Sequence, residues 1–202
     1  MQSYSINQIV PDYQMLIKWS RREIRSFWTG VLKQIDFRIS QLQDLIHQNP
    51  AYSNLILDYN PLSLIPIGKW LKENVTTKPI PKEKYESELK RLNGMEIPPN
   101  YELSDFTKSI CFDIAIYYGE TMLRQLGNNK WFIYNKVSTN NLDFGTMGIR
   151  YGKHNVIFSP FILILSKAFQ ITLNNFEDKE IYTVFHRQVN TIKESESKIY
   201  IK

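Results

Sequence analysis

The feature that most constrains the fold is a long run of apolar residues between Ser104 and Gly127, interrupted by few polar side chains. A helix that is apolar around most of its circumference is buried around most of it. Ser104 suits the N-cap of such a helix, Asp105 suits its first turn, and Gly127 with the two asparagines after it favours its end. We therefore predict that residues 104–127 form a central, buried helix.

Strand-like segments follow this helix. The residues from Trp131 to Lys136 and from Asp143 to Tyr151 favour strands, and Asn140-Asn141 lies in the turn between them. A third strand is expected from Val156 to Phe158. The chain is therefore expected to have an α+β fold, in which a small, mostly antiparallel sheet is flanked by helices.

The residues before the central helix predict further helices and two short strands. Apolar residues at helical spacing predict an N-terminal helix from Pro11 or Asp12 to about Thr29. Two units follow in which a short apolar–Asp–aromatic segment precedes a helix. Ile35 to Phe37 precede a helix that begins near Ser40, and Leu57 to Tyr59 precede one that begins near Pro61. We predict that these are two short strand–helix units.

A chain of 202 residues is expected to form a single domain, here residues 1–202. The N-terminal helix and the two strand–helix units occupy residues 1–75. Residues 76–103 are flanked by prolines and predict a long loop that carries a short charged helix from Lys82 to Leu92. The central helix, the hairpin and two C-terminal helices, from Pro160 to Leu173 and from Glu177 to Glu194, occupy residues 104–197.

The composition narrows the cellular setting and the kind of partner. The net charge is +5, which favours acidic partners. The charge is spread along the chain without a basic block, which argues against nucleic-acid binding. A single cysteine, Cys111, allows no intramolecular disulfide and favours a reducing compartment. The first residues lack the pattern of a secretory signal, and no segment is apolar enough to span a membrane, so a cytoplasmic location is expected.

One polar stripe on the central helix is a candidate catalytic site. Asp113, Tyr117, Glu120 and Arg124 follow one another at intervals of i, i+4, i+7 and i+11, so they share one face of the helix. Two carboxylates on one face could serve a small hydrolase as general acid and base, although their backbones are about 10 Å apart along the axis. The alternative is a structural seam in which Glu120 pairs with Arg124. We favour the structural interpretation.

Other catalytic chemistry finds little support in the residues. His47, His154 and His186 do not share a metal-ligand spacing, and no metal site is expected. Cys111 lies in an apolar stretch that does not favour a thiolate. The glycines near Gly145 and Gly148 lack the strand–glycine loop–helix context of a nucleotide site. We therefore predict no cofactor and no catalytic residue, and we expect that the protein is not an enzyme.

A basic stripe is predicted on the N-terminal helix. Lys18, Arg21, Arg22 and Arg25 recur at i, i+3, i+4 and i+7. Such a stripe is most often the solvated face of an amphipathic helix. The alternative is a docking surface for an anionic partner, including nucleic acid.

Aromatic residues are abundant, and we expect that some of them lie on the surface. Protein interfaces favour Tyr, Trp and Arg. A chain with many aromatics and no convincing active site is compatible with a protein-binding role. We do not expect that all six of the following aromatic residues lie in the core: Tyr4, Tyr13, Trp19, Tyr52, Tyr101 and Tyr134.

Two segments resemble a known family. Leu57 to Leu71 carries an LDYxxxSL motif, and Asp113 to Tyr134 carries a YxGExxxR motif followed by a tryptophan. Together they resemble the paired motifs of an uncharacterised bacterial family that is similar to the immunity proteins of polymorphic-toxin systems. The matching positions are Asp58, Tyr59, Ser63, Leu64, Tyr118, Gly119, Glu120, Arg124 and Trp131.

The resemblance implies a protein that neutralises a cognate secreted toxin by stoichiometric binding. The positive charge suggests an acidic face on that toxin. The loop from Thr76 to Tyr101 is a candidate contact element, although the sequence assigns no partner-binding residues. Two alternatives stay open: a small hydrolase that uses Asp113 and Glu120, and a nucleic-acid-associated protein that uses the stripe from Lys18 to Arg25.

Overall fold

Helix α6 (Asp105–Leu126) is the centre of the fold in the computed structural model, which describes residues 4, 13–92, 99–127, 129–135, 144–151 and 156–197. Every residue from Ser109 to Gly119 is buried. The helix begins where the Ser104 side chain accepts a hydrogen bond from the backbone N–H of Thr107, and it ends at Gly127, whose φ is +75°. The predicted central, buried helix is confirmed.

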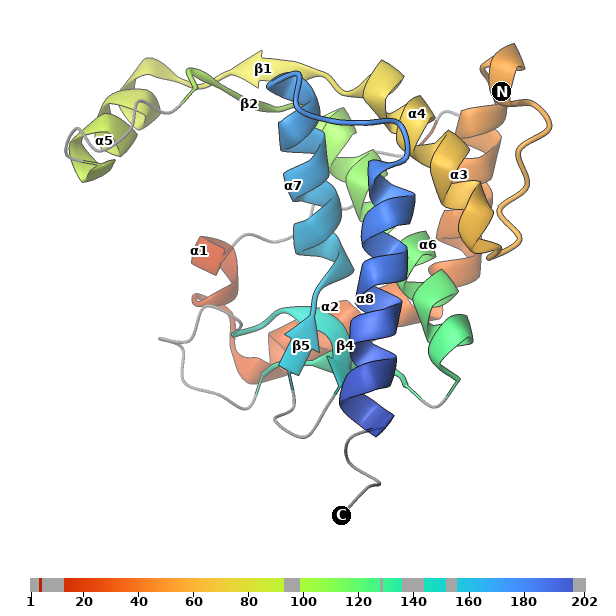
Figure 1. Ribbon diagram of the computed structural model, residues 1–202. Coiled ribbons are helices and arrows are strands. Elements are labelled where there is room, and N and C mark those ends of the chain that lie inside the picture. Colours follow the sequence, from red (N-terminus) through yellow and green to blue (C-terminus); the bar gives the residue numbers. More distant parts are fainter. Residues whose placement is uncertain are drawn as a thin grey trace.

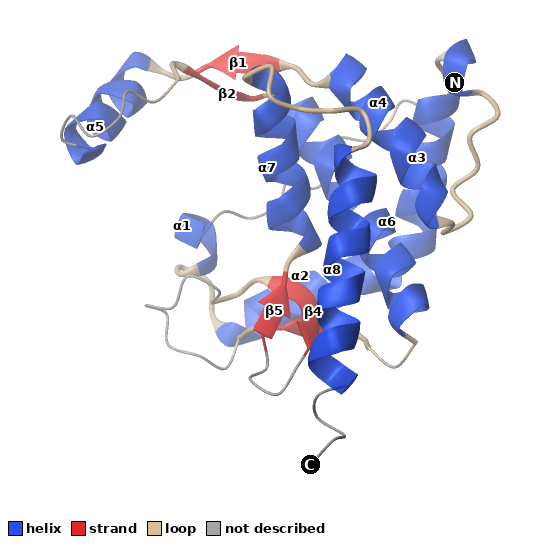
Figure 2. Ribbon diagram, viewed as in Figure 1, coloured by secondary structure: helices blue, strands red, loops and turns tan. Residues whose placement is uncertain are grey.

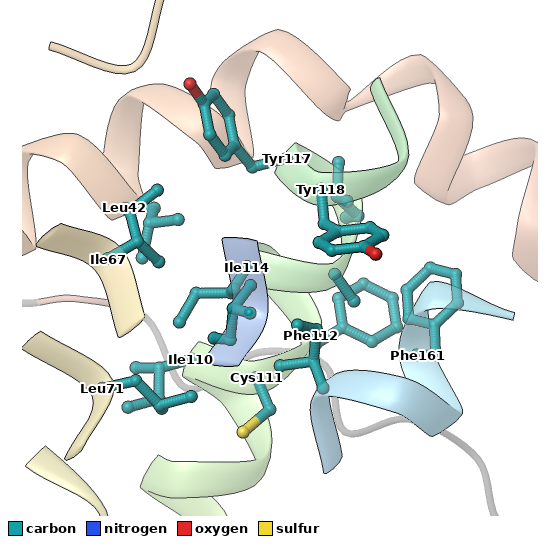
Figure 3. Packing of buried hydrophobic residues seen from close by; sticks show 14 of the residues in the cluster. Leu42, Ile67, Leu71, Ile110, Cys111, Phe112, Ile114, Tyr117, Tyr118 and Phe161 are labelled. Atoms are coloured by element: carbon teal, nitrogen blue, oxygen red, sulfur yellow. The ribbon is translucent and has the colours of Figure 1, made fainter. Parts of the chain in front are cut away.

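Five other helices pack around α6 or cover the elements beside it (Figure 1). Its core contacts include aromatic pairs: Phe112 lies 5.0 Å from Phe161 and 6.2 Å from Trp28, ring centre to ring centre. Figure 3 shows Phe112 and Tyr118 directed toward Phe161, and Ile110 beside Leu71. These helices are α2 (Arg21–Lys33), α3 (Ile35–His47), α4 (Leu64–Asn74), α7 (Pro160–Thr172) and α8 (Glu180–Ser197).

Two small antiparallel sheets lie at opposite ends of the helical body (Figure 2). Strands β3 (Trp131–Ile133), β4 (Met147–Tyr151) and β5 (Val156–Phe158) form a sheet in the order β3-β4-β5. Its register pairs Phe132 with Gly148 and Arg150 with Ile157. The indole of Trp28 on α2 donates to the Gly145 carbonyl at 2.7 Å, which ties that helix to the approach of β4. The predicted α+β fold is confirmed.

The second sheet belongs to the segment that the sequence predicted as a loop. Strands β1 (Thr77–Pro79) and β2 (Tyr101–Leu103) pair antiparallel, and α5 (Lys82–Leu92) lies between them along the chain. The helix within 76–103 is confirmed, whereas its two strands were not predicted, because three-residue strands are too short for a visible alternation. Figure 1 shows this arm extending from the body at the upper left.

The N-terminal helix differs from its prediction. A single helix from Pro11 or Asp12 to Thr29 is wrong, because α1 (Tyr13–Leu16) ends before a turn and α2 begins at Arg21. Ser20 caps α2: its hydroxyl accepts from the Glu23 N–H at 3.2 Å, while the Glu23 carboxylate accepts from the Ser20 N–H at 2.6 Å. This reciprocal pair is the capping box that an S-x-x-E spacing specifies.

Neither of the two predicted strand–helix units has a strand. Ile35 to Phe37 form the first turn of α3, and Leu57 to Tyr59 form a bend in which Tyr59 has a φ of +64°. Short apolar segments do not distinguish a strand from a helical turn, and tertiary contacts decide between them. The chain from Pro61 starts as a short 3₁₀ turn, η2 (Pro61–Ser63), before α4. A further 3₁₀ turn, η1, comprises Pro50–Tyr52.

The remaining predicted boundaries hold in part. Strand β3 ends at Ile133, earlier than expected, and β4 begins at Met147. The predicted Asn140-Asn141 turn lies outside the described residues, as do Asp143 and His154. None of the described helices combines the length and the apolar character needed to cross a membrane.

Candidate functional site

The side chains of the polar stripe on α6 contact three separate parts of the fold. Its first member, Asp113, has 1% of its surface exposed. Both Nε and Nη2 of Arg38 lie 2.6 Å from its Oδ1, and the Tyr4 hydroxyl donates to its Oδ2. Burial raises the pKa of Asp113 to about 6, although the Arg38 guanidinium and the Tyr4 hydroxyl act to lower it. Asp113 therefore joins α6 to α3 inside the core.

The second attachment joins α6 to the sheet. Oε1 of Glu120 accepts a hydrogen bond from the Trp131 indole N–H at 2.7 Å. The indole lies against the helix backbone at Gly119, where a Cβ would overlap the Cη2 and Cζ2 atoms of Trp131. The glycine, the glutamate and the tryptophan of the YxGExxxR…W motif therefore form one packing unit that positions β3.

The third attachment holds the bend at Tyr59. The Arg124 guanidinium carbon lies 3.1 Å from the centre of the Tyr59 ring, and that ring stacks on Tyr117 at 5.4 Å. The Tyr117 hydroxyl accepts from the Tyr59 N–H at 2.9 Å and lies 2.6 Å from the Ser63 hydroxyl. The predicted Glu120–Arg124 pair is wrong, because each side chain has a different partner. The two motif segments are far apart in the chain, and the bend of the first therefore packs directly on α6, which carries the second.

The carboxylates of the stripe do not share a site. Asp113 is directed toward α3 and Glu120 toward β3, and each is hydrogen-bonded to a separate partner. A pair that acted as general acid and base would have to converge on one substrate atom. The geometry gives both carboxylates a structural task, and the hydrolase hypothesis loses the arrangement on which it rested.

Substitutions at the Glu120–Trp131 bond should affect stability. Glu120→Leu removes the acceptor and is expected to lower the free energy of unfolding by about 1–3 kcal/mol, because the half-buried indole N–H loses a hydrogen bond to a charged acceptor. Glu120→Gln keeps an acceptor oxygen and should cost less. Urea unfolding of both variants, alone and combined with Trp131→Phe, measures the coupling. If the effects of Glu120→Leu and Trp131→Phe were additive, this bond would not be the cause.

Cys111 and the described histidines make contacts within the fold. Cys111 is fully buried, and burial raises the pKa of its thiol. His47 Nε2 lies 2.6 Å from the Leu55 carbonyl oxygen, and His186 packs edge-on against Tyr182 at 4.5 Å. Within the described ranges, no group of three or more His, Cys, Asp or Glu side chains is arranged to hold a metal ion.

The basic stripe is exposed but is not a single helical stripe. Lys18 lies in the turn before α2, while Arg21, Arg22 and Arg25 lie on the helix; all four are exposed. None of the four forms an ion pair with a carboxylate of the described residues. The nearest acid along α2, Glu23, is engaged in the capping box. No acidic side chain in the described part of the chain therefore neutralises this face.

A groove lies between α2 and β3. Its volume is about 320 Å³. The Arg150 guanidinium carbon lies 4.5 Å from the centre of the Phe132 ring at the groove. The sequence alone did not single out Phe132 or Arg150, because their proximity depends on strand register. We call this surface the α2–β3 groove; it is lined by Arg25, Leu32, Trp131, Phe132, Ile133, Asn135 and Arg150.

The exposed apolar residues are not the predicted aromatics. Of the six aromatic residues that were not all expected in the core, Tyr52 is buried, whereas Tyr4, Trp19, Tyr101 and Tyr134 are half-buried; the side chain of Tyr13 lies outside the described residues.

Two aliphatic residues, Ile56 and Leu62, are instead 64% and 57% exposed on either side of the half-buried Tyr59. We call Ile56, Tyr59, Leu62 and Arg124 the Tyr59 surface. Two side-chain turns shape it: Asp58 Oδ1 accepts from the Asn60 N–H at 2.9 Å, and Asn60 Oδ1 accepts from the Leu62 N–H at 3.0 Å. These bonds fix the backbone between the exposed side chains.

Comparison of the chain with protein-family models, with curated proteins and with solved structures finds no match.

Proposed function

We propose that this protein is a stoichiometric, protein-binding inhibitor: an immunity protein that neutralises a cognate bacterial toxin in the cytoplasm. The observation that carries the proposal is the Tyr59 surface. It joins the two segments whose motifs resemble those of immunity proteins, because Arg124 lies over the Tyr59 ring, and two exposed aliphatic residues, Ile56 and Leu62, flank Tyr59 in the chain.

The composition of this surface suits a protein interface. Tyrosine and arginine are enriched among the residues that dominate binding energy. Here the Tyr59 ring is already held by Tyr117 and Arg124, and its backbone N–H is bonded to the Tyr117 hydroxyl. A surface that is ordered before binding loses less conformational entropy when the partner arrives. An inhibitor needs such a complementary surface and no catalytic group.

The charge of the chain supports an acidic partner. The exposed cations of α2 are not neutralised by the described acidic residues, so they can attract an acidic face over several ångströms. Such attraction mainly accelerates association. The arm that carries α5 stays a predicted contact element, and its position away from the body leaves it open to a partner (Figure 1).

The proposal predicts that co-expression with the toxin encoded by the neighbouring gene yields a stable complex and restores growth. Tyr59→Ala combined with Leu62→Ala should weaken the complex at least about tenfold in titration calorimetry, because interface anchors of this type dominate affinity. The matched control removes exposed apolar groups elsewhere on the surface, at Ile162 and Leu173, which are 56% and 58% exposed. A wild-type protein that binds no neighbour-encoded protein but hydrolyses a small ester, glycoside or phosphate would contradict the proposal.

A further inference from the structure

We propose that the α2–β3 groove binds an extended, acidic segment of the partner protein, which adds to the sheet at strand β3. This inference rests on the proposed function, because it names where and how an acidic partner is held. The groove shares no residue with the Tyr59 surface and binds by a different chemistry, so its binding can be tested separately.

The charge of the α2–β3 groove suits an acidic segment. Arg25 and Arg150 line the groove from α2 and β4, both are exposed, and neither is paired with a carboxylate among the described residues. Arg21 lies one helical turn before Arg25 on the same face of α2. Arginine binds carboxylates through two parallel hydrogen bonds, so unpaired arginines at a groove favour Asp and Glu side chains.

Strand β3 lies at the edge of its sheet and can accept an added strand. β3 is the end strand in the order β3-β4-β5, and within the described part of the chain only β4 pairs with it. The groove follows this strand, since Trp131, Phe132, Ile133 and Asn135 all line it. An edge strand presents backbone donors and acceptors to an added strand, and alternate side chains of that strand enter flanking pockets. Acidic residues at alternate positions would then reach the arginines.

The aromatic residues of the groove favour a peptide over nucleic acid. Single-stranded nucleic acid binds on open aromatic faces. The Trp131 indole instead packs against the backbone of Gly119 and donates to Glu120, and the Arg150 guanidinium covers one face of the Phe132 ring. These rings form the apolar floor of a groove, with little free surface for stacked bases.

The groove and the Tyr59 surface are neighbours. Trp131 is fastened to Glu120, and Arg124 is one turn further along α6, about 6 Å along the helix axis. One partner could therefore cover the Tyr59 surface with a folded face and extend an acidic segment into the groove.

The first test needs no known partner. The probe is a fluorescent eight-residue peptide with alternating Glu and Val, and its binding is followed by anisotropy at low and at physiological salt. The wild-type protein should bind it, the Arg25→Glu/Arg150→Glu variant should bind about tenfold more weakly or not at all, and an alternating Lys–Val peptide should not bind. The control variant, Lys69→Glu/Lys193→Glu, reverses two exposed lysines on α4 and α8 and should bind as the wild type does.

Several outcomes would overturn the inference. One is that the groove variant and the control variant bind the acidic peptide equally well. A second is that folded wild-type protein does not bind this peptide. A third is that the wild-type protein binds an oligouridine more tightly than the acidic peptide and that the groove variant does not bind the oligouridine. The last result would assign the groove to nucleic acid. With the neighbour-encoded toxin, the groove variant should associate more slowly than the control variant. Failure of the toxin to bind, with peptide binding retained, would contradict the proposed function and leave the groove assignment intact.

Discussion

Arg38→Ala is expected to lower the free energy of unfolding by about 3–5 kcal/mol at neutral pH, because it breaks a buried ion pair and leaves one charge behind. Arg38 and Asp113 are 4% and 1% exposed, and their closest atoms are 2.6 Å apart. Removal of the guanidinium leaves a carboxylate in the core with only the Tyr4 hydroxyl as a described donor. The variant also loses the cation–π contact of Arg38 with the Phe112 ring, at 4.8 Å.

The loss should depend on pH in a defined direction. Burial already raises the pKa of Asp113, and removal of Arg38 raises it further because the guanidinium lowers it in the wild type. When the pKa of an Asp is higher in the folded state than in the unfolded state, the folded state binds more protons at pH values between the two pKa values. The free energy of unfolding therefore falls as the pH rises through that range. Urea unfolding should therefore show a smaller loss near pH 5 than near pH 7.5.

The control for this prediction replaces the whole pair. Arg38→Met combined with Asp113→Leu removes both charges and fills similar volume, and it should be far more stable than Arg38→Ala alone. A loss in Arg38→Ala that is the same at both pH values would contradict the assignment of the effect to a stranded Asp113 carboxylate.

Gly119→Ala is the second substitution with a large expected effect. The new methyl group would overlap the Trp131 indole, so the indole must leave the helix surface and its bond to Glu120 must break. Overpacking of this kind costs about 1–3 kcal/mol, and the lost hydrogen bond between the half-buried indole and the Glu120 carboxylate adds about 1–3 kcal/mol. Thermal and urea unfolding measure the loss.

Gly30→Ala is a matched control for Gly119→Ala. Gly30 also lies within a helix, α2, but a Cβ there would meet no atom within 4 Å. That substitution should stabilise the protein by up to about 1 kcal/mol, since alanine favours a helix over glycine. In a Trp131→Ala background, Gly119→Ala should lose most of its penalty. If the penalty stayed the same in that background, the indole would not be its cause.

The central helix could be predicted because its signal is local and long. More than twenty consecutive residues agree on one conformation, and a serine and a glycine mark its two ends. Strand β5 and helix α7 were also found from local signals, namely a short apolar run and Ser159-Pro160. Where many neighbouring residues agree, tertiary contacts have little to override.

The contacts of the α6 stripe could not be predicted from spacing. Asp113 is bonded to Arg38, which is 75 residues away in the chain, and Tyr117 to Tyr59, which is 58 residues away. The i+4 rule favours Glu120 with Arg124, but such a surface pair contributes only about 0.3–0.5 kcal/mol. The half-buried indole N–H of Trp131 and the Tyr59 ring offer Glu120 and Arg124 stronger partners, so the tertiary contacts prevail. The strands predicted at Ile35 and Leu57 failed for a similar reason, because three residues carry too little local preference.

The three contacts of the α6 stripe also limit changes in the length of this helix. Asp113, Tyr117, Glu120 and Arg124 reach α3, the Tyr59 bend and β3 from fixed angles around one helix. An inserted or deleted residue within this stretch would rotate every later side chain by about 100° and move it about 1.5 Å along the axis. Insertions and deletions within residues 113–124 are therefore expected to be poorly tolerated, so that this stretch should keep a constant length in related chains even where their surface residues differ.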